Sequence, residues 1–309
     1  MAQISPKAFS KDLAKQLFPD NVFYTKAMKD IAAGDVESVD IPIAGNIGSA
    51  KQGTPILPLT IGERTDDVKN YSLTQIWAEP ILVKREEEIV LNYNKQLDIV
   101  RTQGEAMATR AANYAANAWG STGGSSFVTL TTGTARATSL TGATGNRKAI
   151  AKADLLKVRN IFMKQNLRTL NGIIAVLTPD QYNDILGITE FVDFEKTGLV
   201  SKLEMGILGR ILGFEVMVRW DADLGSIGLH YDATGANKKE NGTVASTDAP
   251  AALFYHPDYV RYAEAYPETI INRKAPGYLG ATIIESVVRF GATPSRNDGK
   301  GVVSLVEAT

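Results

Sequence analysis

The stretch EEEIVLNYNKQLDIVRTQGEAMATRAANYAANAW, residues 86–119, carries a long helical pattern. Apolar or small residues recur in it at alternating steps of four and three positions, which places them along one side of a helix. They are Tyr93, Leu97, Val100, Gly104, Met107, Ala111, Tyr114 and Ala118. At 1.5 Å of rise per residue the helix is roughly 50 Å long, well above the average for globular domains. The stretch therefore predicts a long amphipathic helix, either the spine of a wide structural protein or a core helix of an ordinary enzyme.

Composition excludes several classes of protein. The chain has 309 residues, of which 44% are hydrophobic, and this is enough for one to three folded domains. The formal net charge is −1 and the basic residues are dispersed, which argues against strong nucleic-acid binding but leaves room for weak contact. Without cysteine there is no disulfide, thiolate metal site or cysteine nucleophile. We expect no secretory signal and no membrane span, because no apolar stretch approaches 18 residues.

Residues 36–85 predict a long hairpin. Val39, Ile41 and Ile43 alternate with polar or proline residues, as in a half-buried strand, and a matching strand is expected to begin at Tyr71. The intervening tract is rich in glycine and proline, and its apolar residues have no spacing that would pack on their own subunit. We expect it to reach onto another molecule, the alternative being a flexible surface loop. The candidate subunit-interface residues are Ile47, Lys51, Ile56, Leu57, Leu59 and Ile61.

The second half of the chain predicts an α/β layer. A helical pattern at 154–167 precedes a buried strand at 173–177, and Thr178 then caps a helix from Pro179 to about Leu186. Another strand is predicted at 214–220, and residues 120–147 are expected to be a connector rich in glycine, serine and threonine. Four further strands are expected at 251–255, 259–262, 281–290 and 302–306, which could return to the sheet begun near the long helix.

No pattern of catalytic, cofactor-binding or metal-ligating residues stands out. A phosphate-binding loop and a serine nucleophile elbow are both missing from the sequence. The only histidines are His230 and His256, too few for the usual zinc sites without cysteine, and His256 is expected to end a strand. The acidic run 86–88 is expected to begin the long helix, where the helix dipole favours negative charge. We therefore expect no enzyme and no cofactor.

The order of these parts resembles the major capsid protein of tailed bacteriophages, a fold shared with herpesvirus capsid floors and encapsulin shells. The segments that carry the resemblance are VDIPIA at 39–44, residues 71–90, LTPDQY at 177–182, GRILGFEV at 209–216, and residues 281–289 followed by GATP at 291–294. The resemblance implies an α+β fold. Its parts would be an N-terminal arm at 1–35, an extended β-hairpin loop at 36–85, a peripheral domain with the spine helix at 86–148 and 250–309, and an axial α/β domain at 149–249.

The resemblance also implies a function and partners. A chain of this family would assemble in the host cytoplasm through pentamers and hexamers into the icosahedral virion head around double-stranded DNA, with only weak non-specific contact to that DNA. The arm would fold back on its own domain or lie across a neighbour. Many members begin with a removable scaffolding segment of roughly a hundred residues, and none precedes this arm, so a separate scaffolding protein is expected. A portal protein, and in some members a decoration protein, would complete the head.

Some members join a loop lysine to an asparagine of another subunit. Lys51 and Lys69 are the lysines available in this loop, but no motif marks the asparagine, and we expect no cross-link. Two alternatives to a phage head remain open. An encapsulin-like nanocompartment would use the same fold, and an α/β enzyme would need a polar site that the sequence does not show. A binding module that stays monomeric is a third, weaker alternative.

Overall fold

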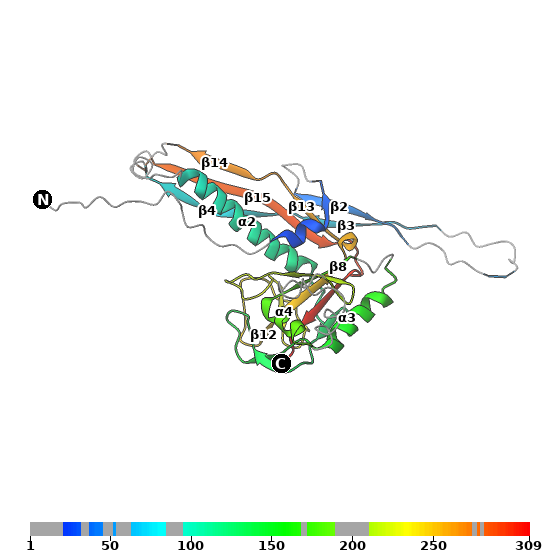
Figure 1. Ribbon diagram of the computed structural model, residues 1–309. Coiled ribbons are helices and arrows are strands. Elements are labelled where there is room, and N and C mark those ends of the chain that lie inside the picture. Colours follow the sequence, from blue (N-terminus) through cyan, green and yellow to red (C-terminus); the bar gives the residue numbers. More distant parts are fainter. Residues whose placement is uncertain are drawn as a thin grey trace.

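The computed structural model describes residues 21–31, 37–45, 52–53, 63–84, 95–167, 172–188, 210–273, 277–278 and 281–309. Two bodies are visible in Figure 1: an elongated one formed by a sheet and a long helix, and a rounded one below it formed by a second sheet and shorter helices. The long helix runs from the first body into the second. The architecture is therefore α+β, as expected.

The long helix, α2, spans Lys95–Trp119, and residues 86–94 lie outside the described part. Its C-terminal half follows the predicted stripe, with Met107 and Ala111 buried. In the N-terminal half the prediction is wrong: Leu97 is 68% exposed, whereas Ile99 and Gln103 are buried. The side that faces the sheet therefore includes a polar residue, because the Gln103 side-chain amide donates to the backbone carbonyls of Glu79 and Ile284.

The elongated body is built on a five-stranded sheet around β15 (Thr282–Pro294). β15 pairs with β4 (Thr74–Val83) on one side, and with β13 (Val260–Glu264) and β14 (Glu268–Asn272) on the other. As predicted, Ile284, Val288 and Phe290 face one way and are buried, and α2 covers this side of the sheet. The expected return of C-terminal strands to the sheet beside the spine helix is confirmed for β13 and β15.

Residues 21–31 fold back on their own chain. The short helix η1 (Val22–Lys26) places Phe23 and Tyr24 in the core, and β1 (Met28–Asp30) runs parallel to β13. The Lys26 ammonium pairs with the Glu215 carboxylate of the rounded body. Of the two expectations for the arm, folding back holds for these residues, while residues 1–20 lie outside the described part.

A seven-stranded sheet forms the rounded body. Its order is β5 (Val128–Leu130), β16 (Val302–Val306), β12 (Asp248–Tyr255), β8 (Ile173–Leu177), β10 (Phe214–Val218) and β9 (Arg210–Ile211), with β11 (His230–Asp232) paired to β12. The expected return of the C-terminal strands to the sheet beside the spine helix is therefore wrong for β12 and β16: β12 pairs with β8, and β16 pairs with β12 and β5. The domain boundary expected at residue 250 falls within β12, and β12 pairs with β8 of the other expected domain.

Helices cover both faces of this second sheet. α3 (Lys152–Lys164) and α4 (Pro179–Leu186) pack on one face, and the C-terminal half of α2 packs on the other. The predicted cap is confirmed: Thr178 Oγ1 accepts from the Gln181 amide, and Gln181 Oε1 accepts from the Thr178 amide. The strand predicted at 214–220 ends at Val218. The expected connector carries β5 and the pair β6 (Ala135–Ala137) and β7 (Asn146–Lys148).

None of the described helices has both the length and the apolar character required to cross a membrane.

Candidate assembly surfaces

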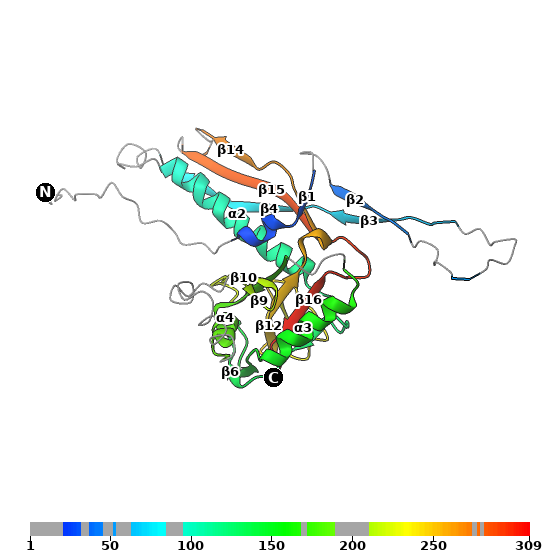
Figure 2. The same cartoon turned by 45° about the vertical axis from the view of Figure 1, so that its right-hand side comes forward.

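The hairpin is present and projects from the elongated body as a narrow ribbon (Figure 2). β2 (Ser38–Ile43) pairs antiparallel with β3 (Asp67–Ser72), and Val39 lies opposite Tyr71. The matching strand was expected to begin at Tyr71, and this is wrong, because it begins at Asp67 and has nearly ended at Tyr71. A ribbon with little burial needs no alternating apolar face, so the residues of β3 give no strand signal. The candidate residues Ile47, Lys51, Ile56, Leu57, Leu59 and Ile61 lie outside the described residues.

A small buried cluster fastens the base of the hairpin. Ile41 and Tyr71 pack with Ala263 of β13. The Tyr71 hydroxyl donates to Asp30 Oδ2 at 2.8 Å, and Arg261 Nη1 donates to the other oxygen of the same carboxylate at 2.7 Å. Burial, together with Asp30, raises the pKa of Tyr71, so its hydroxyl stays a donor. The base is thus tied to both β1 and β13.

The face of the five-stranded sheet that points away from α2 carries exposed and half-exposed apolar side chains, interspersed with charged ones such as Glu285 and Arg289. We call the apolar residues of this face the outer sheet face; they are Trp77, Leu82, Ile270, Ile283 and Val287. Trp77 lies opposite Val287, and Leu82 lies opposite Ile283. Trp77 is 63% exposed and Ile270 is 47% exposed. Large apolar side chains exposed together on one face make that face a candidate interaction site.

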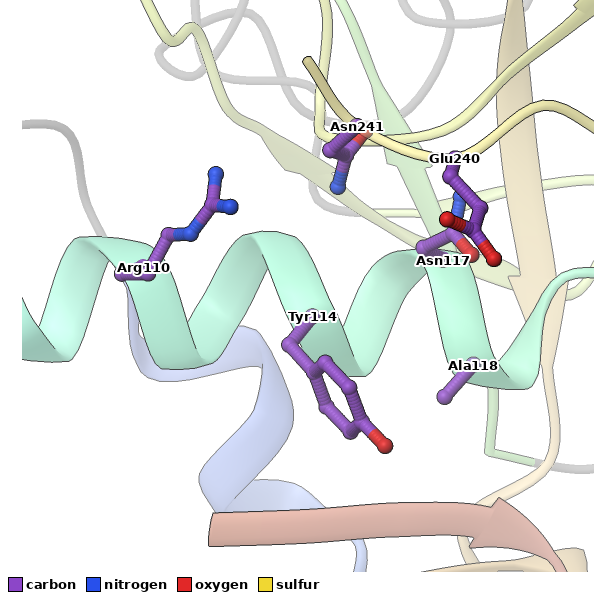
Figure 3. Close-up of a pocket in the computed structure, with 6 residues that line it drawn as sticks. All are labelled: Arg110, Tyr114, Asn117, Ala118, Glu240 and Asn241. Atoms are coloured by element: carbon purple, nitrogen blue, oxygen red, sulfur yellow. The ribbon is translucent and has the colours of Figure 1, made fainter. Parts of the chain in front are cut away.

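A polar pocket of about 370 Å³ lies between α2 and the insert that follows β11. Arg110, Tyr114, Asn117 and Ala118 of the helix line it, together with Glu240 and Asn241 of the insert. Figure 3 shows Arg110 at one end and Glu240 at the other, separated along the helix. One guanidinium and one distant carboxylate supply neither a nucleophile nor an acid–base pair, so this arrangement offers no obvious chemistry.

The histidines and acidic residues form no metal site in the part of the chain that the structure describes, where no group of three potential ligands comes together. His256 ends β12 as predicted, and its Nδ1 accepts from the Asp258 amide at 3.2 Å, which caps the short helix η2 (Pro257–Tyr259). The acidic run 86–88 lies outside the described residues.

Lys238 of the insert is hydrogen-bonded to the C-terminal end of α2. Its buried ammonium donates to the Asn117 and Gly120 carbonyls, both at 2.9 Å. In return, Asn117 Nδ2 donates to the Lys239 carbonyl at 2.7 Å, and Asn241 Nδ2 donates to the Asn113 carbonyl at 3.1 Å. A cation at a helix C-terminus also interacts favourably with the helix dipole. The polar insert, residues 232–248, is therefore fixed to the spine helix.

Replacing Lys238 with methionine should change the pH dependence of stability. Burial lowers the pKa of Lys238 to about 8, against 10.5 in the unfolded chain. The unfolded state therefore binds more protons between these values, and this lysine makes the free energy of unfolding rise with pH across that window, by at most about 3 kcal/mol. Urea unfolding at pH 8 and 10.5 should show that Lys238→Met lacks this part of the rise. The exposed Lys157 gives a matched control as Lys157→Met, and equal pH profiles for all three proteins would contradict the assignment.

Solved structures of phage capsids share this fold along nearly the whole chain. The capsid structure of cyanophage P-SCSP1u is 16% identical with a TM-score of 0.68, covering 99% of this chain and 93% of that chain. The cyanophage Pam1 capsid asymmetric unit is 11% identical with a TM-score of 0.65, covering 100% and 99%. This chain has the fold of the tailed-phage major capsid proteins. The mature capsid of bacteriophage PhiM1 agrees, at 13% identity and a TM-score of 0.65, covering 99% and 92%.

Sequence comparison alone does not reach this result. No protein-family model matches the chain, and no curated protein sequence is detectably similar to it. The hairpin projects from the elongated body, and the outer sheet face includes exposed large apolar side chains such as Trp77 and Ile270. They are the candidate assembly surfaces.

Proposed function

We propose that this chain is a major capsid protein, which self-assembles through pentamers and hexamers into the icosahedral head that encloses the double-stranded DNA genome of a tailed phage. Similarity of fold to phage capsid subunits from one end of the chain to the other is the observation that carries this proposal. It is a structural role without catalysis, performed in the virion.

The proposed assembly contact joins the two candidate surfaces. The hairpin of one subunit lies on the outer sheet face of its neighbour, so that Ile47, Ile56, Leu57, Leu59 and Ile61 are buried against Trp77 and Ile270. Each large apolar side chain that is removed from water contributes about 1.5–3 kcal/mol, and this contribution recurs at every subunit contact of the shell. Lys51 would lie at the rim of the contact, where a charged head can stay in water.

The two bodies correspond to the two proposed domains. The peripheral domain consists of α2 and the five-stranded sheet, and the axial domain consists of the seven-stranded sheet, which would meet its copies around the five-fold and six-fold centres. Pairing supports drawing the division by sheet, with β12 and β16 assigned to the axial domain. Residues 1–20 are proposed to extend to a neighbouring subunit.

The remaining partners are proposed from the same role. A separate scaffolding protein would guide assembly, a portal protein would occupy one vertex, and a decoration protein could bind the outside. A net charge of −1 suits a wall that touches packaged DNA weakly, because strong phosphate binding would hold the genome to the shell.

Substitution of the hairpin tests the proposal. The double variant Leu57→Asp, Leu59→Asp should keep the fold of the subunit but form no shells, because two charges would have to be buried in every contact. Circular dichroism would measure folding, and negative-stain electron microscopy would measure assembly. Trp77→Asp on the receiving face should give the same result. Leu156→Asp is the matched control, because Leu156 is 42% exposed on α3, away from both surfaces, and its shells should be normal. Normal shells from the double variant would refute the proposed contact.

A further inference from the structure

The connection between the two sheets holds several parts of the molecule together. We call residues 295–301 the inter-sheet turn, because they join β15 of the five-stranded sheet to β16 of the seven-stranded sheet. The Ser295 amide donates to the Tyr259 carbonyl at 2.8 Å. At the other end of the turn, the Gly301 amide donates to Gln165 Oε1 at 2.9 Å, just after α3. The two ends of the turn are therefore held by hydrogen bonds to different parts of the chain.

The inter-sheet turn and the end of β15 also hold the hairpin. Lys69 Nζ of β3 donates to the Pro294 carbonyl at 2.7 Å and to the Arg296 carbonyl at 3.2 Å. Two residues further along the ribbon, Asp67 Oδ2 accepts from Asn297 Nδ2 at 3.1 Å. Burial lowers the pKa of Lys69, an effect that Asp298 opposes. Hydrogen bonds to these two backbone carbonyls offset the cost of removing the ammonium group partly from water.

A second, separate point fixes the hairpin nearer its base. A Cβ atom on Gly291 of β15 would lie 2.8 Å from the Ser72 carbonyl oxygen and 3.2 Å from the Tyr71 ring. The end of β3 therefore lies directly against β15, and only glycine allows this approach. Tyr71 is also tied to Asp30, as described above.

Because the hairpin is attached to the rest of the subunit at two points, its direction is fixed. With one attachment alone it could rotate about that point. Lys69 lies two residues from Tyr71, roughly 7 Å along an extended strand. Beyond Lys69 the ribbon has little packing of its own, and Val68 is 58% exposed. A small change of angle at Lys69 is magnified toward residues 45 and 63, because each residue advances the strand by about 3.3 Å.

We propose that Lys69 is a positioning residue that, with the inter-sheet turn, sets the direction in which the hairpin projects and thereby the curvature of the assembled shell. This inference rests on the proposed assembly function. It couples hairpin direction to both bodies, because the turn that holds Lys69 is continuous with both sheets. A rearrangement of one sheet against the other would be passed to the hairpin through these hydrogen bonds.

The test compares Lys69→Met with Lys69→Arg and with the exposed control Lys157→Met. In the unassembled subunit, Lys69→Met should speed amide hydrogen exchange in β3 about tenfold, which is the effect of losing one or two hydrogen bonds from a charged donor. The thermal unfolding midpoint of the whole subunit should be nearly unchanged. Lys69→Arg should restore slow exchange, because a guanidinium can also donate to two carbonyls.

The diameter of the assembled shells distinguishes a positioning role from a purely structural one, because a lysine that only stabilised the subunit would not change this diameter. Electron microscopy of wild-type shells should show one diameter, whereas Lys69→Met should give several diameters, open sheets or tubes, and Lys69→Arg should narrow the distribution again. A single unchanged diameter for Lys69→Met would overturn the proposal, even if exchange were faster. If Lys69→Met fails to fold, Asn297→Ala weakens the same attachment and should broaden the distribution in the same way.

The outcomes separate this inference from the proposed function. If the wild-type chain forms no shells with its scaffolding partner, the assembly function fails, and hydrogen exchange in β3 still decides whether Lys69 holds the ribbon. If wild-type shells form and Lys69→Met shells are identical to them, the capsid role stands and the positioning role is refuted.

Discussion

Replacing Trp119 with alanine is expected to lower the free energy of unfolding by about 3–5 kcal/mol, the range for deleting a fully buried aromatic side chain. Trp119 is 0% exposed and ends α2 where the two bodies meet. The centroid of its ring lies 6.1 Å from the ring centroid of Phe23 and 5.1 Å from that of Tyr255. Its Nε1 donates a hydrogen bond to the Arg261 carbonyl at 3.0 Å. The substitution therefore removes packing against three separate segments and leaves a buried carbonyl without its donor.

Urea unfolding followed by circular dichroism would measure this loss in the unassembled subunit. A typical domain is stable by only about 5–15 kcal/mol, so we also expect fewer soluble subunits and fewer shells at growth temperature. Trp77→Ala is the matched control, because Trp77 is 63% exposed in the single chain. It should cost the subunit less than about 1 kcal/mol yet weaken assembly. Equal losses of stability for the two variants would show that the spine helix does not end in a shared core.

The features of the fold that could be predicted from the sequence are those that depend on residues close together in the chain. The Thr178 cap and the helix that follows it depend on residues three positions apart, and the structure confirms them. The two faces of β15 follow from simple alternation, and they too are confirmed. The long helix was predictable from its period, but its buried side was not, because Gln103 is polar and its partners in the sheet lie far along the chain.

The features that could not be predicted from the sequence depend on contacts and strand pairing between residues far apart in the chain. The start of β3 was predicted too late in the chain, since Asp67 and Lys69 are polar residues whose partners lie at the end of β15 and in the inter-sheet turn, more than 200 residues away. The membership of β12 and β16 in the second sheet likewise depends on pairing with β8 and β5, which no local pattern reveals. The predicted contact residues of the hairpin remain a prediction, because they lie outside the described residues.

A buried ion pair near the C-terminus is expected to make the free energy of unfolding depend strongly on pH. Arg136 of β6 donates to Glu307 Oε1 at 2.6 Å and pairs with the Asp184 carboxylate at 3.2 Å, with Asp180 more distant at 3.8 Å. Glu307, just after β16, is 0% exposed and also accepts from Gln181 Nε2 at 3.0 Å. The group therefore ties the last strand of the chain to α4 and to β6.

Burial raises the pKa of Glu307 to about 7, an effect that Arg136 opposes and Asp184 reinforces. In the unfolded chain the value is 4.5, so the folded state binds more protons between pH 4.5 and pH 7. The contribution of Glu307 to the free energy of unfolding therefore falls as pH rises through this window, by at most about 3 kcal/mol, and it stays at that lower level above pH 7. The Glu307→Gln variant should lose this slope, because an amide does not titrate.

Arg136→Met should cost about 3–5 kcal/mol at pH 8, because it leaves the Glu307 carboxylate buried without its cation. At pH 5 the cost should be smaller, since Glu307 is then protonated and neutral. Urea unfolding of the wild type, both single variants and the double variant at both pH values would form a double-mutant cycle. In the Glu307→Gln background, Arg136→Met should cost nearly the same at pH 5 and pH 8. An equal cost of Arg136→Met at the two pH values in the wild-type background would show that Glu307 is not the titrating group. The expected pattern makes the attachment of the C-terminal strand depend on Arg136 most strongly above neutral pH, where the buried carboxylate is charged.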